Sequence, residues 1–132
     1  MRNLILSIIL VGIFSSCDDG CSTDISCTEV LISVTTEIVD SENNTVALDS
    51  THTTMEDGTI VYTYIRNDNE DSGFYTVITD SEFDDVERSG TDLIFKGWKD
   101  GIMLIEEQFE VGRDCCHIEK LDGPELITID PS

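Results

Sequence analysis

Apolar and polar side chains alternate over residues 28–38, and this period of two restricts the fold more than any other feature of the sequence. Val30, Ile32 and Val34 fall on one face, whereas Glu29 and Ser33 fall on the other. Successive side chains of a β-strand point to opposite faces of its sheet. The segment therefore predicts a strand with one buried face.

Short β-branched and aromatic runs follow this segment, with polar turn sequences between them. Residues 80–90 lack the alternation, and we expect Ser81 to cap a single helical turn over 82–86. Asp100-Gly101 predicts a two-residue hairpin turn, because both residues tolerate positive φ. Further strands are expected at 46–48, 59–65, 74–78, 92–96, 102–111 and 126–129.

About seven to eight short strands, without a long amphipathic helix, predict one all-β domain of about 100 residues, a β-sandwich. Apolar residues make up 39% of the chain, which is enough for a core, so the sequence does not indicate disorder. The core is expected to contain Val30, Ile32, Val34, Tyr62, Tyr64, Tyr75, Val77, Leu93, Phe95, Met103, Ile105 and Phe109.

The charge balance restricts the partners of the protein. The sequence has 28 acidic and 7 basic residues, a net charge of -21. Such a surface repels the phosphates of nucleic acids and the headgroups of anionic lipids, so we expect no nucleic-acid binding. Cations and basic proteins are the partners that it favours.

The first residues have the layout of a secretory signal peptide, with Arg2, an apolar run over 4–14 and small residues before Cys17. The run is shorter than the roughly 20 apolar residues that a membrane-spanning helix needs. Residues 14–17 resemble the lipobox of bacterial lipoproteins, which implies that Cys17 is lipidated and becomes the new N-terminus. We expect a signal peptide over 1–16, a tether over 17–27 that is held to the membrane through lipid on Cys17, and a β-sandwich domain over 28–132.

Four further cysteines in an exported chain predict disulfides. A bond between the neighbours Cys115 and Cys116 would be strained, so we expect them to pair with Cys21 and Cys27. Neighbouring side chains of a strand point to opposite faces, which lets one cysteine reach the first strand and the other the tether. Which of the two joins Cys27 stays open. Zinc binding by the cysteines and His117 is the alternative, but the spacing is unlike that of zinc sites.

The lipobox, the first strand and the stretch 112–118, which contains Asp-Cys-Cys-His, together resemble small surface lipoproteins of Bacteroidota. This resemblance implies a carboxypeptidase-regulatory-like or transthyretin-like domain, so we expect an immunoglobulin-like or transthyretin-like β-sandwich. It implies a fold and no reaction.

Two short motifs extend the resemblance. The aspartates at 18–19 are similar to the acidic export signal of that phylum, which implies an outer-membrane and surface-exposed lipoprotein. In enteric bacteria an aspartate at this place favours the inner membrane instead, so the leaflet depends on the host. Residues 49–51 resemble an O-glycosylation motif, with Ser50 as the acceptor.

No catalytic constellation is recognisable. The sequence has no nucleophile elbow, no phosphate-binding glycine loop and no partner motif for His52 or His117, which we expect at the surface or in turns. We therefore expect a non-enzymatic binding or structural module of the cell envelope, anchored to the membrane and without a cofactor. Its partner would be an envelope protein or a glycan.

The alternative function is a calcium-dependent adhesion or carbohydrate-contact domain that uses the acidic loops. Asp68, Glu70 and Asp71 are weak calcium candidates, since the loop echoes the first half of an EF-hand but has Thr79 in place of the closing glutamate. Trp98, beside a predicted turn, would serve as the aromatic platform, although packing is its more common role.

Calcium melting curves distinguish the two functions. If Asp68, Glu70 and Asp71 face solvent, changing them to Asn or Gln should alter the free energy of unfolding by less than about 0.5 kcal/mol, with or without calcium. A calcium-dependent melting shift that disappears in the triple variant would favour the alternative function.

Overall fold

The computed structural model describes residues 20–67 and 72–130. They form eight β-strands and one short 3-10 helix, which confirms the predicted all-β class. Among these residues, no helix has the length and apolar character needed to cross a membrane. The elements are β1 (Ser33–Asp40), β2 (Ser50–Met55), β3 (Ile60–Ile65), β4 (Phe74–Thr79), η1 (Asp80–Asp85), β5 (Thr91–Lys99), β6 (Ile102–Arg113), β7 (Ile118–Asp122) and β8 (Leu126–Ile129).

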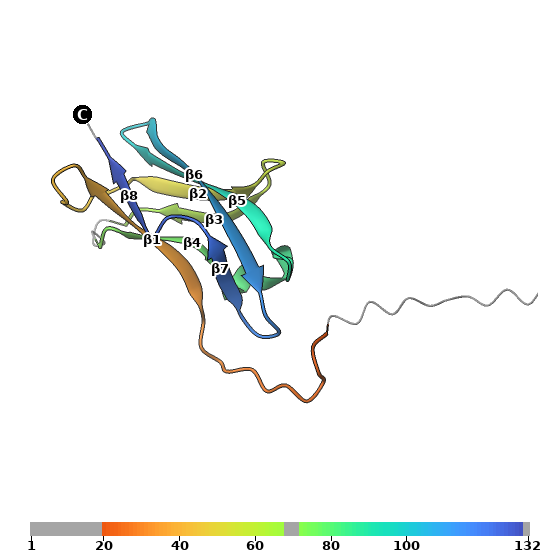
Figure 1. Ribbon diagram of the computed structural model, residues 1–132. Helices are drawn as coiled ribbons and strands as arrows, with labels where there is room; N and C mark the ends of the chain where they lie inside the picture. Colours follow the sequence, from red (N-terminus) through yellow and green to blue (C-terminus); the bar gives the residue numbers. More distant parts are fainter. Residues whose placement is uncertain (1–19, 68–71, 131–132) are drawn as a thin grey trace, which may run out of the picture.

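The strands build two sheets that pack face to face as a sandwich (Figure 1). The smaller sheet has the order β4-β1-β8, with β1 antiparallel to β4 and parallel to β8. The larger sheet has the order β3-β2-β5-β6-β7 and is antiparallel throughout. In Figure 1 the segment 20–32 lies at the end of the sandwich where β6 turns into β7, and the last residues of β8 lie at the opposite end.

The core lies between the two sheets and is completed by the connections. Ile38 and Val77 from the smaller sheet and Phe95 and Phe109 from the larger one are fully buried, as is Leu48 between β1 and β2. The Phe95 and Phe109 rings meet edge to face with centroids 6.0 Å apart, a favourable arrangement of aromatic quadrupoles. The confirmed members of the predicted core are Val34, Tyr75, Val77, Leu93, Phe95, Ile105 and Phe109.

Three residues predicted for the core are exposed instead. Val30 and Ile32 precede β1, which begins only at Ser33, so no second layer covers them. Met103 pairs with Trp98 across a register shift between Gly97 and Trp98. Such a shift inserts an extra residue and reverses which face the following side chains occupy. Tyr62 and Tyr64 are half-buried on the edge strand β3.

Residues 46–48 were predicted as a strand and do not form one. The buried Tyr75 hydroxyl accepts a hydrogen bond from the Leu48 N–H at 2.7 Å and donates one to the Val46 carbonyl at 2.8 Å. A side chain thereby satisfies backbone groups that a neighbouring strand would otherwise pair. Residues 46–48, in the connection from β1 to β2, are therefore held against the core without forming a strand.

Two strands, β2 and β7, were missed. The β2 sequence STHTTM has no apolar residue before its last position, yet Thr51 and Thr53 are fully buried on its inner face. Threonine suits strands because its side chain is β-branched, but hydropathy alone does not reveal its burial. In β7 (IEKLD), Ile118 is buried whereas Leu121 is exposed, so the apolar alternation is too short to indicate a strand.

Both local turn predictions fall in the right places. Asp100 and Gly101 have φ of 51° and 76°, as a two-residue hairpin turn requires. The 3-10 helix η1 occupies the predicted helical turn, but Thr79 caps it and not Ser81. Thr79 Oγ1 accepts from the Ser81 N–H at 3.1 Å, and the Glu82 carboxylate accepts from the Thr79 N–H at 3.1 Å, a reciprocal capping box.

Buried threonine hydroxyls supply a matched test of the core. The Thr53 hydroxyl has no partner among the described residues, whereas the Thr36 hydroxyl donates to the Pro124 carbonyl at 3.0 Å. Valine keeps the shape and removes the hydroxyl, so Thr53→Val should raise the free energy of unfolding by about 1 kcal/mol and Thr36→Val should lower it by about the same amount. Urea unfolding of both variants measures the difference, and shifts of the same sign would contradict it.

Candidate functional site

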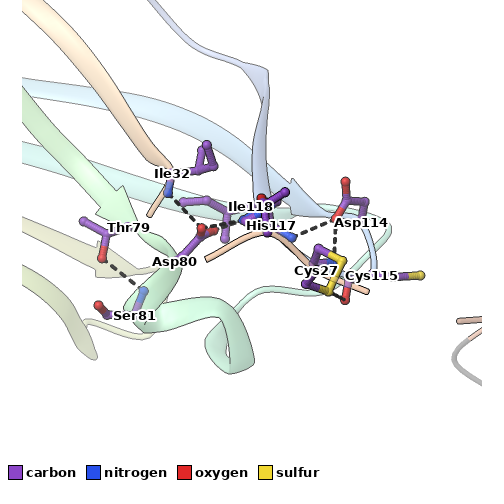
Figure 2. Close-up of polar contacts among 11 residues, drawn as sticks. Cys27, Ile32, Thr79, Asp80, Ser81, Asp114, Cys115, His117 and Ile118 are labelled. Atoms are coloured by element: carbon purple, nitrogen blue, oxygen red, sulfur yellow. Dashed lines mark hydrogen bonds and ion pairs between the residues drawn. A yellow bond between two sulfur atoms is a disulfide. The ribbon is translucent and has the colours of Figure 1, made fainter. Parts of the chain in front are cut away.

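Asp80, the first residue of η1 after β4, links two segments far from it in the sequence, one before β1 and one at the start of β7. Its Oδ2 accepts from the Ile32 N–H at 2.8 Å and lies 2.7 Å from His117 Nδ1, while its Oδ1 accepts from the Ile118 N–H at 2.9 Å (Figure 2). Ile32 leads into β1 of the smaller sheet, and Ile118 begins β7 of the larger one. One carboxylate therefore joins both layers of the sandwich at this end.

The environment of Asp80 favours its charged form. Desolvation, the largest single influence, raises the pKa of Asp80, but the N–H groups of Ile118 and Ile32 and the His117 imidazole together outweigh it, so the pKa lies below its usual value. The side chain is only 12% exposed, and its neighbours satisfy both oxygens. Asp80 is thus an ionised cross-link at neutral pH.

His117 extends this network to the segment before β1. Its Nε2 lies 3.0 Å from Thr28 Oγ1, opposite the Nδ1 that faces Asp80. Since a carboxylate only accepts, Nδ1 carries a proton toward Asp80, while Nε2 shares a hydrogen bond with the Thr28 hydroxyl. The prediction of a turn position is correct, but His117 is 21% exposed and has partners at both nitrogens.

Asp114 shapes the turn that presents the vicinal cysteines. Its Oδ1 accepts from the backbone N–H groups of Cys116 at 2.6 Å and His117 at 2.7 Å, and these bonds lower the pKa of Asp114. The Asp114 N–H in turn donates to the His117 carbonyl at 2.9 Å. An aspartate that satisfies its own turn in this way fixes a tight connection between two strands.

Two disulfides close the same end of the sandwich. Cys21 is bonded to Cys115 and Cys27 to Cys116, with Cα atoms 5.6 and 5.3 Å apart, which confirms the predicted cross-pairing and answers which cysteine joins Cys27. The bonds span sequence separations of 94 and 89 residues. Cross-linking so distant a pair stabilises the folded state by about 4–5 kcal/mol in the chain-entropy model. Since all four sulfurs are bonded, the zinc alternative is wrong.

The order carboxylate, imidazole, hydroxyl in Asp80, His117 and Thr28 is that of a general-base relay. The surroundings indicate a structural role. Asp80 also binds two backbone N–H groups, and Thr28 directly follows the disulfide-bonded Cys27. Two grooves on the described surface are lined by other residues.

One of these grooves, of about 450 Å³, lies on the outer face of the smaller sheet. Glu37 of β1 forms its floor between Phe74 of β4 and Leu126 of β8, its register partners on either side. A volume of this size is in the range of small-ligand and side-chain binding sites. The sequence pattern did not reveal it, because the lining residues come from β1, β4, β7 and β8 and from the residue before β8.

The second groove is acidic and has a volume of about 340 Å³. It is lined by Met55, Glu56, Asp57, Glu87, Gly90, Thr91 and Asp92. Within 20–67 and 72–130, however, no three His, Cys, Asp or Glu side chains converge in a way that could hold a metal ion. The described surface therefore supplies no metal centre.

The remaining predicted site residues are dispersed. Cys17 and the calcium candidates at 68, 70 and 71 lie outside the described residues. Trp98 is half-buried on the outer face of the larger sheet, where its ring meets that of His52 with centroids 4.8 Å apart. His52 is therefore an aromatic neighbour on a strand rather than a turn residue. Ser50 begins β2 and is partly exposed.

No protein-family profile, curated protein or solved structure matches this chain. The geometry described above is therefore the basis for assigning a function.

Replacing Asp80 tests the cross-link. Because the pKa of folded Asp80 lies below its unfolded value, its contribution to stability is present above about pH 4 and disappears as the pH falls through the folded pKa. Asp80→Asn should lower the free energy of unfolding by about 2 kcal/mol at pH 7, with a smaller difference at pH 3. The exposed Asp84→Asn on the same helix is the control. Equal effects of the two variants would contradict the cross-link.

Proposed function

We propose that this protein is a lipid-anchored lipoprotein of the cell envelope, in which the β-sandwich is a non-enzymatic binding or structural module. The observation that carries the proposal is the double disulfide closure of residues 21–27 onto the β6–β7 turn. It fastens the segment that follows the lipobox-like Cys17 to the folded domain. A lipid on Cys17 can position the β-sandwich only if the segment between them is firmly attached to the domain.

The distances support a closely held domain. Cys21 follows Cys17 by four residues, a span of at most about 14 Å when fully extended. A lipid on Cys17 would therefore hold the disulfide end of the sandwich next to the membrane surface. The opposite end, with the β5–β6 hairpin and the last residues of β8, would face away from the membrane (Figure 1).

The two disulfides would also share a pulling force on the anchor between the two sheets. Cys21 and Cys27 are bonded to the turn that follows β6 of the larger sheet, whereas the chain itself continues into β1 of the smaller sheet. Asp80 adds one hydrogen bond to the segment before β1 and one to β7. A force along the tether would thus load both layers together rather than peel β1 away.

The finer assignment belongs to the same proposal. The aspartates at 18–19 support export to the outer membrane and surface exposure, as in the Bacteroidota lipoproteins that the sequence resembles. The transthyretin-like description is supported by a two-sheet sandwich of the right size. An envelope protein or a glycan would be the partner, and the net charge of -21 favours a basic protein.

Metabolic labelling with an alkyne fatty acid tests the anchor. Cys17→Ser should abolish labelling and leave unprocessed or soluble protein, because the thiol that accepts the lipid is gone. The matched control is the double variant Cys21→Ser/Cys115→Ser, which removes cysteines and one disulfide but should stay labelled. Labelling that persists in Cys17→Ser would refute the anchored assignment.

A further inference from the structure

We propose that the groove on the smaller sheet is a docking site for an arginine side chain of a basic protein segment, with Glu37 as its counter-charge. The inference rests on the proposed binding function and names the partner's chemistry. The groove is lined by Thr35, Glu37, Phe74, Lys120, Glu125 and Leu126.

The register of the sheet arranges the groove floor. Glu37 pairs with Phe74 on one side and with Leu126 on the other, so a carboxylate stands between an aromatic and an aliphatic side chain. Phe74 is 58% exposed and Leu126 is 50% exposed. Together they give the groove an apolar side chain on each side of the Glu37 carboxylate.

Glu37 carries the uncompensated charge of the groove. Among the described residues no side chain forms a hydrogen bond or ion pair with its carboxylate, while its backbone N–H donates to the Glu125 carbonyl at 2.8 Å. The other acid, Glu125, is paired with Lys120 at 3.1 Å. One half-buried carboxylate is thus left to attract a cation.

Arginine fits all three components of the floor. Its planar guanidinium binds a carboxylate through two parallel hydrogen bonds and stacks on an aromatic ring, as Phe74 allows. Its aliphatic stem covers an apolar side chain such as Leu126. The net charge of -21 attracts a basic segment over longer distances and repels acidic ones.

Titration of the full-length chain in detergent micelles with the peptide acetyl-Leu-Arg-Leu-amide tests the site. The peptide should bind saturably, and its citrulline counterpart, which keeps the shape without the charge, should bind at least about tenfold more weakly. Glu37→Gln should weaken binding of the arginine peptide by a similar factor. Glu106→Gln, an equal loss of charge on an exposed position of β6, should leave it unchanged.

Phe74→Ser is a second variant, which keeps Glu37 and should also weaken binding because the ring is lost. Thermal unfolding verifies that each variant is folded. Absence of saturable binding, equal binding of the citrulline peptide, no effect of Glu37→Gln, or an equal effect of Glu106→Gln would each overturn the inference. Fatty-acid labelling at Cys17 is a separate readout, so these results leave the anchor proposal to its own test.

Discussion

The attachment of residues 21–28 to the β6–β7 turn is the constraint on which this end of the sandwich depends. Without it, the segment before β1 would be an exposed tail, since Val30 and Ile32 have no covering layer. Two disulfides remove most of that freedom from the unfolded chain, and the loops they close are among the longest that a domain of this size allows. The hydrophobic core then has less conformational entropy to offset.

Asp80 complements the covalent closure with directional contacts. A carboxylate with little exposure is stable only when donors surround it, and here backbone groups from both sheets and the His117 imidazole provide them. The same donors that lower the pKa of Asp80 define the spacing between the starts of β1 and β7. One side chain thus both resists separation of the two sheets and fixes their spacing, as the proposed anchor at this end would require.

The two outer faces of the sandwich differ in chemistry. On the larger sheet, Trp98 is partly covered by the His52 ring, so its aromatic surface is shared rather than free. On the smaller sheet, Glu37 stands unpaired between two exposed apolar residues. The Glu37 carboxylate also lines a groove, together with these two apolar side chains. This contrast places the proposed contact on the smaller sheet.

The sequence by itself determined the all-β class, most strand positions, the Asp100-Gly101 turn and the cross-pairing of the cysteines. These depend on alternation, φ preferences and the strain between neighbouring residues, all of which act over a few residues. Only the tertiary structure decided that Cys27 joins Cys116, that buried threonines make β2 a strand, and that Asp80 meets His117 across 37 residues of chain. These contacts join residues that are distant in the sequence, and they depend on the order of the strands in both sheets. No local sequence pattern predicts that order.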